Sequence, residues 1–232
     1  MYNILMIPVM IVPTLCHYDL LQNMLNTIDY PIDHIIIVDN GGKLDKVECS
    51  FANKISIINM PSNLGVPSSW NLGIKLTPYK KWWLIASDDI EFKPNKLEKI
   101  CKSKFNSIII NFSHGRILSS FALHENVVDS IGLFNEYYYP GIGEENDYLT
   151  RMTRAGYKTY DFDFFTDVGG GGNTGMLLDL FNIENDLGKE TLESLRVDIE
   201  NKKSDWDLDH RRKMENLLVE NSEFYRNNYS QL

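Results

Sequence analysis

The stretch HIIIVDNGG, residues 34–42, sets the fold class. Four apolar residues follow His34 in a row, and the run ends at Asp39, Asn40 and two glycines. A short, continuous apolar run that is rich in β-branched residues and stops at turn formers predicts a strand buried on both faces. Such strands are typical of parallel sheets covered by helices. This stretch therefore predicts an α/β protein.

The segments around this strand repeat an alternation of strand and helix. Apolar strands are predicted over residues 3–12, 54–59 and 82–92, and amphipathic helices over residues 18–28 and 65–75. This order favours a mostly parallel, Rossmann-like sheet with helices on both faces. We expect one domain over residues 1–180, followed by a charged, helical C-terminal extension over residues 181–232.

Polar residues, a glycine or a proline stand at or just after the end of each early strand. Along the chain they are Pro13, Thr14, Asp39, Asn63, Gly65, Asp88 and Asp89. Each of them alone is also explained as a turn residue. Ligands of open α/β sheets bind outside the carboxyl ends of the strands, however, and the recurrence of such residues predicts a binding site along this edge.

Asp88 and Asp89 place two adjacent carboxylates at the end of an apolar strand. Their mutual repulsion is relieved most directly by a divalent cation, and oxygen ligands suit Mg²⁺ or Mn²⁺. An aspartate N-cap or a solvated turn is the alternative explanation. The pair is the first candidate for a metal site in this sequence.

The stretch GIGEENDYLTRMTRAGYK, residues 141–158, gathers Glu144, Glu145 and Asp147 at the start of a predicted helix. Acids at a helix start are stabilised by the helix dipole, which is one sufficient explanation. Helical spacing also predicts that Glu145 shares a face with Leu149 and Met152, where a carboxylate is costly unless it is paired or used. Asp147 and Arg151 are four residues apart and are expected to pair.

The composition bounds the class of protein. The chain has 232 residues, 43% hydrophobic content and a net charge of −9, which indicates a globular protein and makes nucleic acid an improbable partner. Three scattered cysteines indicate reduced thiols and a cytoplasmic location. The apolar N-terminus lacks a basic start and is too short for a membrane span, so we expect neither a signal peptide nor a span.

Six segments in order carry a family resemblance: PTLCHYDLLQNML, IIIVDNGG, NLGVPSSWNLGI, WWLIASDDIEFKP, SSFALHENVVDSIGLFNE and GEENDYLTRMTRAGYK. From about residue 7 to 160 the chain resembles the GT-A-fold glycosyltransferases of family 2, including their rhamnosyltransferase-like group. The resemblance implies a catalytic domain over residues 1–180. Its nucleotide-sugar half would span about residues 1–92, and its acceptor half about residues 93–180.

The resemblance also implies a role for each candidate residue. Pro13, Thr14 and Asp39 would hold the nucleotide base, Asn63 and Gly65 would pack beneath the nucleotide, and Asp88 would lie beside it. Asp89 would be the main metal ligand, with Asp88 and Asp167 as further candidates, although Ser87 stands where the family often has an acid. Glu145 takes the position of the family's general base, with Glu144 beside it, and Tyr139 and Asp147 would meet the acceptor.

The predicted function is a metal-dependent, inverting transfer of a sugar from a nucleotide diphosphate sugar to an acceptor hydroxyl. UDP or dTDP donors are favoured and GDP is possible, while the acceptor is a glycan or another hydroxyl compound. A nucleotidyltransferase and a non-catalytic nucleotide- or sugar-binding protein are the alternatives. The C-terminal helices offer a surface for a homodimer.

Overall fold

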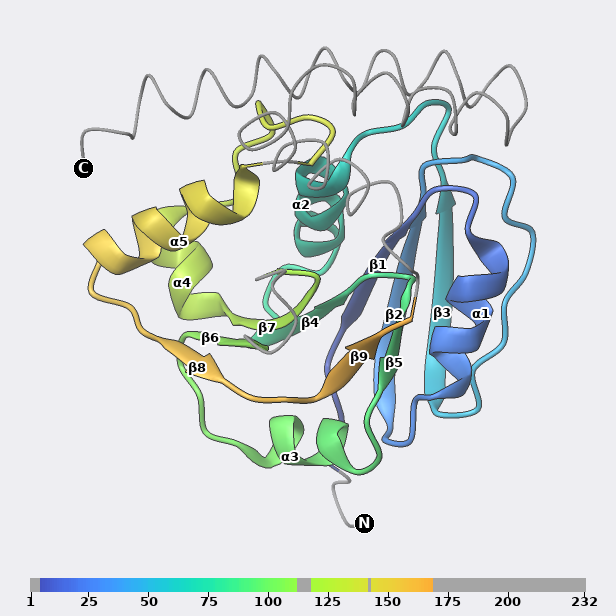
Figure 1. Cartoon of the computed structure of the whole chain (residues 1–232), viewed down its shortest axis with the longest axis horizontal. Helices are drawn as coiled ribbons and strands as arrows, with labels where there is room; N and C mark the ends of the chain where they lie inside the picture. The colour runs from blue at the N-terminus through green and yellow to red at the C-terminus, as the bar shows by residue number, and fades with distance from the viewer. Residues whose placement is uncertain (1–4, 112–117, 142, 169–232) are drawn as a thin grey trace, which may run out of the picture.

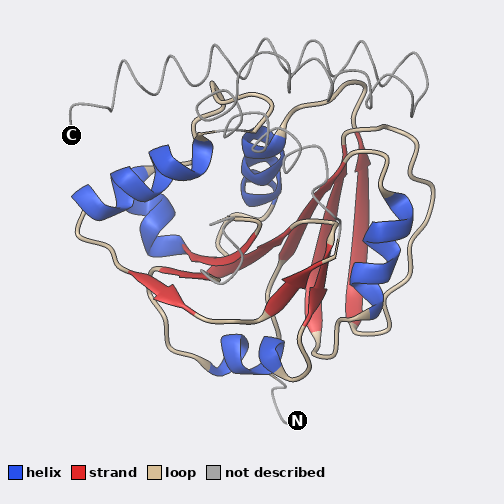
Figure 2. Ribbon diagram, in the orientation of Figure 1, coloured by secondary structure: helices blue, strands red, loops and turns tan. Residues whose placement is uncertain are grey.

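The structure is a computed structural model that describes residues 5–111, 118–141 and 143–168 (Figure 1). The expected C-terminal extension and its dimer surface lie outside the described residues, and so does the glycine run after Val168. Within the described part, helices cover both faces of a central sheet (Figure 2).

The main sheet has seven strands in the order β3-β2-β1-β4-β7-β6-β8. Neighbouring strands run parallel except where β7 lies antiparallel to both β4 and β6. Along the chain its strands are β1 (Met10–Thr14), β2 (Ile32–Asp39), β3 (Ala52–Asn59), β4 (Trp82–Ala86), β6 (Ile108–Ile110), β7 (Ser120–His124) and β8 (Thr159–Asp161). The mostly parallel sheet expected from the sequence is confirmed.

Successive residues of the inner strands point to opposite faces of the sheet and enter different cores. One core lies under α1 (Tyr18–Asn26) and α3 (Lys96–Lys102), and it receives Met10 and Val12 of β1. The other lies under α2 (Val66–Leu76), α4 (Glu125–Ile131) and α5 (Glu144–Arg154), and it receives Ile11. Because both faces are covered, the inner strands are apolar without alternation, as the stretch at residues 34–42 indicated.

Two predicted strands differ from the structure. The first strand begins at Met10 rather than at residue 3, and it continues through Pro13 to Thr14; Ile7 makes only an isolated bridge to Ile32. Pro8, which has no N–H group to donate to a ladder, separates that bridge from β1.

The predicted strand over residues 82–92 is two strands. β4 ends at Ala86, and after a turn through Asp88 and Asp89 the chain enters β5 (Ile90–Phe92). β5 leaves the main sheet and pairs antiparallel with β9 (Phe165–Asp167) in a small second sheet. Apolar content alone did not show this break, because residues on both sides of the two aspartates are buried.

The carboxyl ends of the parallel strands meet at one edge. The register places Thr14 beside Asp39, and Asp39 beside Asn59. β4, on the other side of β1, runs in the same direction, so the Asp88–Asp89 turn follows at this edge too. The fold therefore assembles the strand-end residues that the sequence singled out.

Candidate functional site

Thr14 joins the ends of β1 and β4. Its hydroxyl donates a 2.6 Å hydrogen bond to Asp88 Oδ2, and both residues are buried. His17 Nδ1 lies 3.9 Å from the same carboxylate oxygen, on the loop between β1 and α1. His17 was not among the residues predicted from the sequence, and the only signal for it was its place just after a strand end. A threonine, an aspartate and a histidine thus meet at the site.

Asp88 and Asp89 are adjacent buried carboxylates, 8% and 6% exposed. Burial raises the pKa of Asp88 to about 7; the charge of Asp89 adds to the increase, and the Thr14 hydrogen bond opposes it. A buried pair of this kind favours a bound cation over two separate negative charges. The residues present therefore fit a hard divalent metal ion.

Asp167 lies next to this turn through the small sheet. It is paired with Ile90 across the β5–β9 ladder, and the N–H of Val168 donates to the carbonyl of Asp89 at 3.0 Å. Within residues 5–111, 118–141 and 143–168, no group of three or more His, Cys, Asp or Glu side chains is arranged to hold a metal ion. Asp167 as a ligand stays a prediction.

Asp39 holds the loop that follows β2. It is fully buried, Oδ1 accepts from the N–H of Gly41 at 2.9 Å, and Oδ2 accepts from the N–H groups of Lys43 and Leu44 at 2.7 and 2.8 Å. The Tyr18 hydroxyl donates to both oxygens at 3.1 and 3.2 Å. Burial and the Asp39 charge raise the pKa of Tyr18 to about 12, so the phenol stays a donor.

Asn63 and Gly65 form the turn that starts α2. Asn63 Oδ1 accepts from the N–H of Gly65 at 2.8 Å, and Gly65 has a φ of 78°, a left-handed conformation that favours glycine. A Cβ at Gly65 would lie 2.8 Å from the ring of Tyr139 and 2.9 Å from the carbonyl oxygen of Pro140. The structure thereby brings the predicted nucleotide-side turn against the predicted acceptor-side residue Tyr139.

Asn40 is a second residue that sequence reasoning missed. It is 7% exposed; its amide donates to Ser69 Oγ at 3.0 Å and its Oδ1 accepts from the N–H of Leu64 at 2.8 Å. It therefore ties the end of β2 to the segment that starts α2. Its position directly after Asp39 was the available signal.

The acids of α5 are arranged differently from the prediction. The buried side chains of the helix are Glu144, Asp147, Tyr148 and Met152. Leu149 and Met152 contact the second core as predicted, but Glu145 is only half-buried, and Glu144 is the more buried of the two neighbouring acids. Glu145 Oε2 accepts from the N–H of Leu118 at 3.2 Å.

Glu144 is 6% exposed, and its Oε2 has no hydrogen-bond partner among the described residues. Burial raises its pKa to about 8, and the charge of Glu145 adds to the increase. The two neighbouring acids are thus unequal. A pKa of about 8 favours the protonated form of Glu144 at pH 7, whereas Glu145 accepts from a backbone N–H group.

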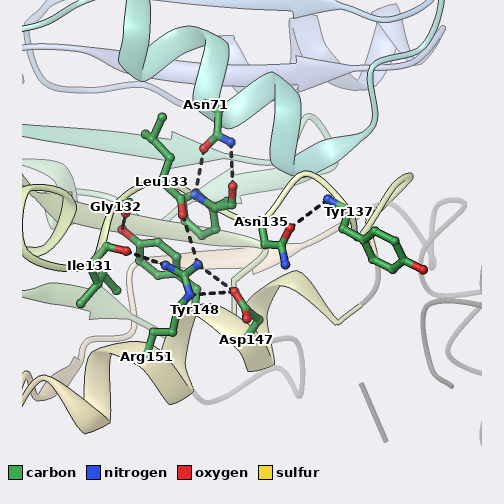
Figure 3. Close-up of polar contacts among 10 residues, drawn as sticks. Asn71, Ile131, Gly132, Leu133, Asn135, Tyr137, Asp147, Tyr148 and Arg151 are labelled. Carbon is green, nitrogen blue, oxygen red and sulfur yellow. Dashed lines mark hydrogen bonds and ion pairs between the residues drawn. The ribbon is translucent and has the colours of Figure 1, made fainter. Parts of the chain in front are cut away.

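Asp147 and Arg151 form the predicted pair (Figure 3). Arg151 donates from Nε and Nη2 to Asp147 Oδ2 at 2.9 and 2.7 Å, and from its two terminal nitrogens to the carbonyl oxygens of Ile131 and Leu133. Asp147 is only 1% exposed. It has a structural role here, and its contact with an acceptor stays a prediction.

Comparison with known proteins finds a family match over less than half of the chain. Residues 11–104 match the family model described as "Glycosyl transferase family 2". A galactofuranosyl glycosyltransferase of Leishmania donovani is 40% identical over 47 residues, which are 20% of this chain and 11% of that protein. This chain therefore matches only a small part of that relative's length.

Two solved structures resemble this protein in the path of the backbone. A Drosophila β1,4-galactosyltransferase 7 mutant in complex with manganese, UDP-Gal and xylobiose has a TM-score of 0.49 at 11% identity, with 69% of each chain covered. Residues 1–349 of S. aureus TarS have a TM-score of 0.49 at 14% identity, with 95% of this chain and 73% of that chain covered.

No helix in the described part of the chain has the length and apolar character needed to cross a membrane.

Proposed function

We propose that this protein is a GT-A-type glycosyltransferase of family 2 that moves a sugar from a nucleotide diphosphate sugar to an acceptor hydroxyl, with inversion and with a divalent cation. One observation carries the proposal: Thr14, Asp39 and the Asp88–Asp89 pair end neighbouring strands at one edge of the sheet, within the segment that matches the family. The short match to a galactofuranosyl glycosyltransferase supports the same activity. The rhamnosyltransferase-like group remains the proposed subgroup.

The donor nucleotide lies, in this proposal, across the ends of β1, β2 and β3. Pro13 and Thr14 line the base, and the Asn63–Gly65 turn lies beneath the nucleotide. Asp39 acts on the base through the loop it holds, because three backbone N–H groups and the Tyr18 hydroxyl already bond its carboxylate. UDP and dTDP remain the favoured nucleotides, with GDP as a further candidate.

A divalent cation would be held by Asp89, with Asp88 beside it and Asp167 as a further oxygen ligand. When bound, Mg²⁺ or Mn²⁺ supplies positive charge to the leaving diphosphate. The support for this assignment is the buried acid pair itself, since the pKa of Asp88 is raised by burial and by the neighbouring charge. Thr14 orients the Asp88 carboxylate through its hydroxyl.

Glu145 is the proposed general base. A base must be ionised at the working pH and must reach the proton that it takes. Glu144 is buried with its pKa raised to about 8, so it is protonated at pH 7 and fits an uncharged neighbour better than a base. Tyr139, which packs on Gly65 between the two halves, is the proposed contact for a glycan acceptor.

The test is a panel of UDP-, dTDP- and GDP-sugars, incubated with the protein with and without Mn²⁺, and scored for release of the nucleoside diphosphate. We expect metal-dependent release from one donor class, and inversion at the anomeric carbon when NMR is applied to the transferred sugar. An inert protein that also binds none of these nucleotides would refute the proposal.

The base is tested by Glu145→Gln, with Glu144→Gln as the matched control. Glutamine keeps size and polarity but cannot take the proton, so kcat should fall by about 10²-fold or more in Glu145→Gln. Glu144→Gln replaces a neutral acid with a neutral amide and should keep kcat within a few-fold at pH 7. Glu145→Asp should retain partial activity. The reverse order of the two glutamine variants would assign the base to Glu144.

A further inference from the structure

Asn71 is a buried amide in the middle of α2, 1% exposed, that bonds to a segment far along the chain (Figure 3). Its Nδ2 donates to the carbonyl oxygen of Phe134 at 2.9 Å, and its Oδ1 accepts from the N–H of Phe134 at 3.0 Å. The same Nδ2 donates to Glu136 Oε1 at 2.8 Å. One side chain therefore fixes both backbone groups of Phe134.

Phe134 connects Asn71 to α5, because its ring contacts Tyr148 of that helix. Its ring stacks on Tyr148 with centroids 3.9 Å apart and an angle of 19° between the planes, and it meets Trp70 edge-on. The Tyr148 hydroxyl donates to the carbonyl of Gly132 at 3.2 Å. Tyr148 lies one helical turn after Glu144 on the same buried face. A shift of Phe134 would therefore move the start of α5.

The segment after Phe134 returns to α2 at a second point. The N–H of Val66, the first residue of α2, donates to the carbonyl of Pro140 at 2.7 Å, and Tyr139 packs on Gly65. Gly141 also lies against Val66, since a Cβ there would be 2.8 Å from that side chain. Both ends of the loop over residues 134–141 are thus attached to one helix, and the α5 acids follow directly.

Arg151 of α5 holds the backbone just before Phe134. It holds the carbonyls of Ile131 and Leu133 at 2.8 and 3.1 Å while it pairs with Asp147. Helix α2 begins at the nucleotide-side turn, and α5 begins with the acids. The loop over residues 134–141 is the part that connects their two starts, and Asn71 is its buried polar anchor.

We propose that Asn71 is a positioning residue that fixes the acids at the start of α5 relative to the nucleotide-side turn Asn63–Gly65. The inference rests on the proposed function, because it assigns the spacing between the donor side and the base of that same site. Asn71 acts through Phe134 and Tyr148 and does not touch the reacting atoms.

The test is Asn71→Asp, which keeps the volume and the acceptor for Phe134 N–H but replaces the amide donor with a carboxylate facing Phe134 O and Glu136. The probe is the donor nucleotide sugar that the wild-type protein hydrolyses in the panel, with water as acceptor. We expect kcat to fall about 10-fold, since a small misplacement of catalytic groups has a cost of this order or larger. KM for the donor should change less than about two-fold, because Asn63 and Gly65 keep their contacts.

Thr77→Val is the matched control. Thr77 is buried and is the C-cap residue of the same helix, α2. Its hydroxyl accepts from Trp83 Nε1 at 2.9 Å and donates to the carbonyl of Gly73 at 2.8 Å. The substitution removes both of these buried hydrogen bonds without touching residues 131–141, so it lowers stability while kcat should stay within about two-fold. Hydrogen exchange adds a readout independent of activity: amides of residues 135–141 and 144–148 should exchange faster in Asn71→Asp than in Thr77→Val.

Glu136→Ala keeps the inference testable if Asn71→Asp does not fold. Glu136 is exposed, and its removal takes away one acceptor of Asn71 Nδ2. We expect a fall in kcat of about three-fold with an unchanged donor KM. An unchanged kcat in Asn71→Asp, or in Glu136→Ala if Asn71→Asp does not fold, overturns the inference. A raised KM for the donor with an unchanged kcat also overturns it, because it would place Asn71 in donor binding. An inert wild-type protein refutes the proposed function, and this inference with it.

Discussion

Asp39 shows how one residue determines the shape of the site. Its two oxygens hold the backbone of residues 41, 43 and 44, and the residue is fully buried. An aspartate at a strand end is an ordinary turn former. What distinguishes this one is that its bonds close a loop against the end of β2, beside Thr14.

Asp39→Asn should destabilise the protein by about 1–3 kcal/mol, because the amide presents N–H groups to backbone N–H groups and leaves a buried donor unsatisfied. The measurement is the urea unfolding midpoint, and nucleotide affinity should weaken in the same variant. Asp45→Asn, an exposed position in the same loop, is the control and should unfold like the wild-type protein. An equal midpoint for Asp39→Asn would show that the loop does not depend on this carboxylate.

Glu144 makes stability depend on pH in an unusual direction. Burial raises its pKa from 4.5 to about 8, so between these values the folded protein holds a proton that the unfolded chain has released. The contribution of Glu144 to the free energy of unfolding is therefore fully present below about pH 4.5 and is lost as the pH rises through about 8.

Between pH 5.5 and pH 8 the free energy of unfolding should fall in the wild-type protein and should fall less in Glu144→Gln. The two decreases should differ by about 1 kcal/mol or more, since one pKa unit corresponds to about 1.4 kcal/mol. Urea unfolding at the two pH values measures the difference. Glu91→Gln, on the exposed side of β5, is the control. Parallel pH profiles for wild type and Glu144→Gln would mean that Glu144 is ionised in the folded protein.

At the scale of elements, the packing of α2 on β1 decides where the nucleotide-side turn lies. Gly73 faces Ile11, and a Cβ at Gly73 would lie 2.6–2.7 Å from three atoms of the Ile11 side chain. The helix therefore approaches the strand more closely than any residue with a side chain allows. This approach places Gly65 and Asn71 against the loop that leads to α5.

Gly73→Ala should lower the unfolding free energy by about 1–3 kcal/mol through overpacking, although alanine is the better helix former by about 1 kcal/mol. Urea unfolding measures it, and Ile11→Val in the same chain should restore part of the loss. Leu76→Ala, exposed on the same helix, is the control and should change little. A stabilised Gly73→Ala would mean that the helix can move away from β1 at no cost.

At the scale of the whole molecule, the Asp88–Asp89 turn lies where the main sheet and the small β5–β9 sheet meet. Ligands that bind only the folded protein stabilise it according to their concentration and affinity. If UDP and Mn²⁺ bind together at this turn, the two should raise the melting temperature more than either alone.

We expect UDP with MnCl₂ to raise the melting temperature of the wild-type protein by several degrees, since a ligand at about 100 times its Kd stabilises the folded protein by about 2.7 kcal/mol. Asp89→Asn should lose this joint shift and EDTA should abolish it in wild type, as a thermal-shift assay can measure. The unliganded variant should stay folded, because Asp89 lies in a turn rather than among the core side chains. An undiminished shift in Asp89→Asn would place the metal elsewhere.

Several features followed from the sequence because they depend on local chemistry. The apolar run at residues 34–42, the helix that begins near Tyr18 and the i,i+4 pair Asp147–Arg151 are all present in the structure. Periodicity and turn formers carry this information along the chain, and parallel strand order then predicts that polar strand ends share an edge.

Tertiary contacts decided the rest. The strand predicted over residues 82–92 divides because β5 finds its partner in β9, more than 70 residues later. Glu144 rather than Glu145 is buried because of how α5 docks on the second core, which a helical wheel fixes only to within one position. Asn71 carries no signal of its own, since its partners Phe134 and Glu136 are more than 60 residues away. The sequence by itself determined the early strands and helices and the edge that they share, whereas long-range contacts, which exist only in the folded chain, decided where a strand divides and how deep each side chain lies.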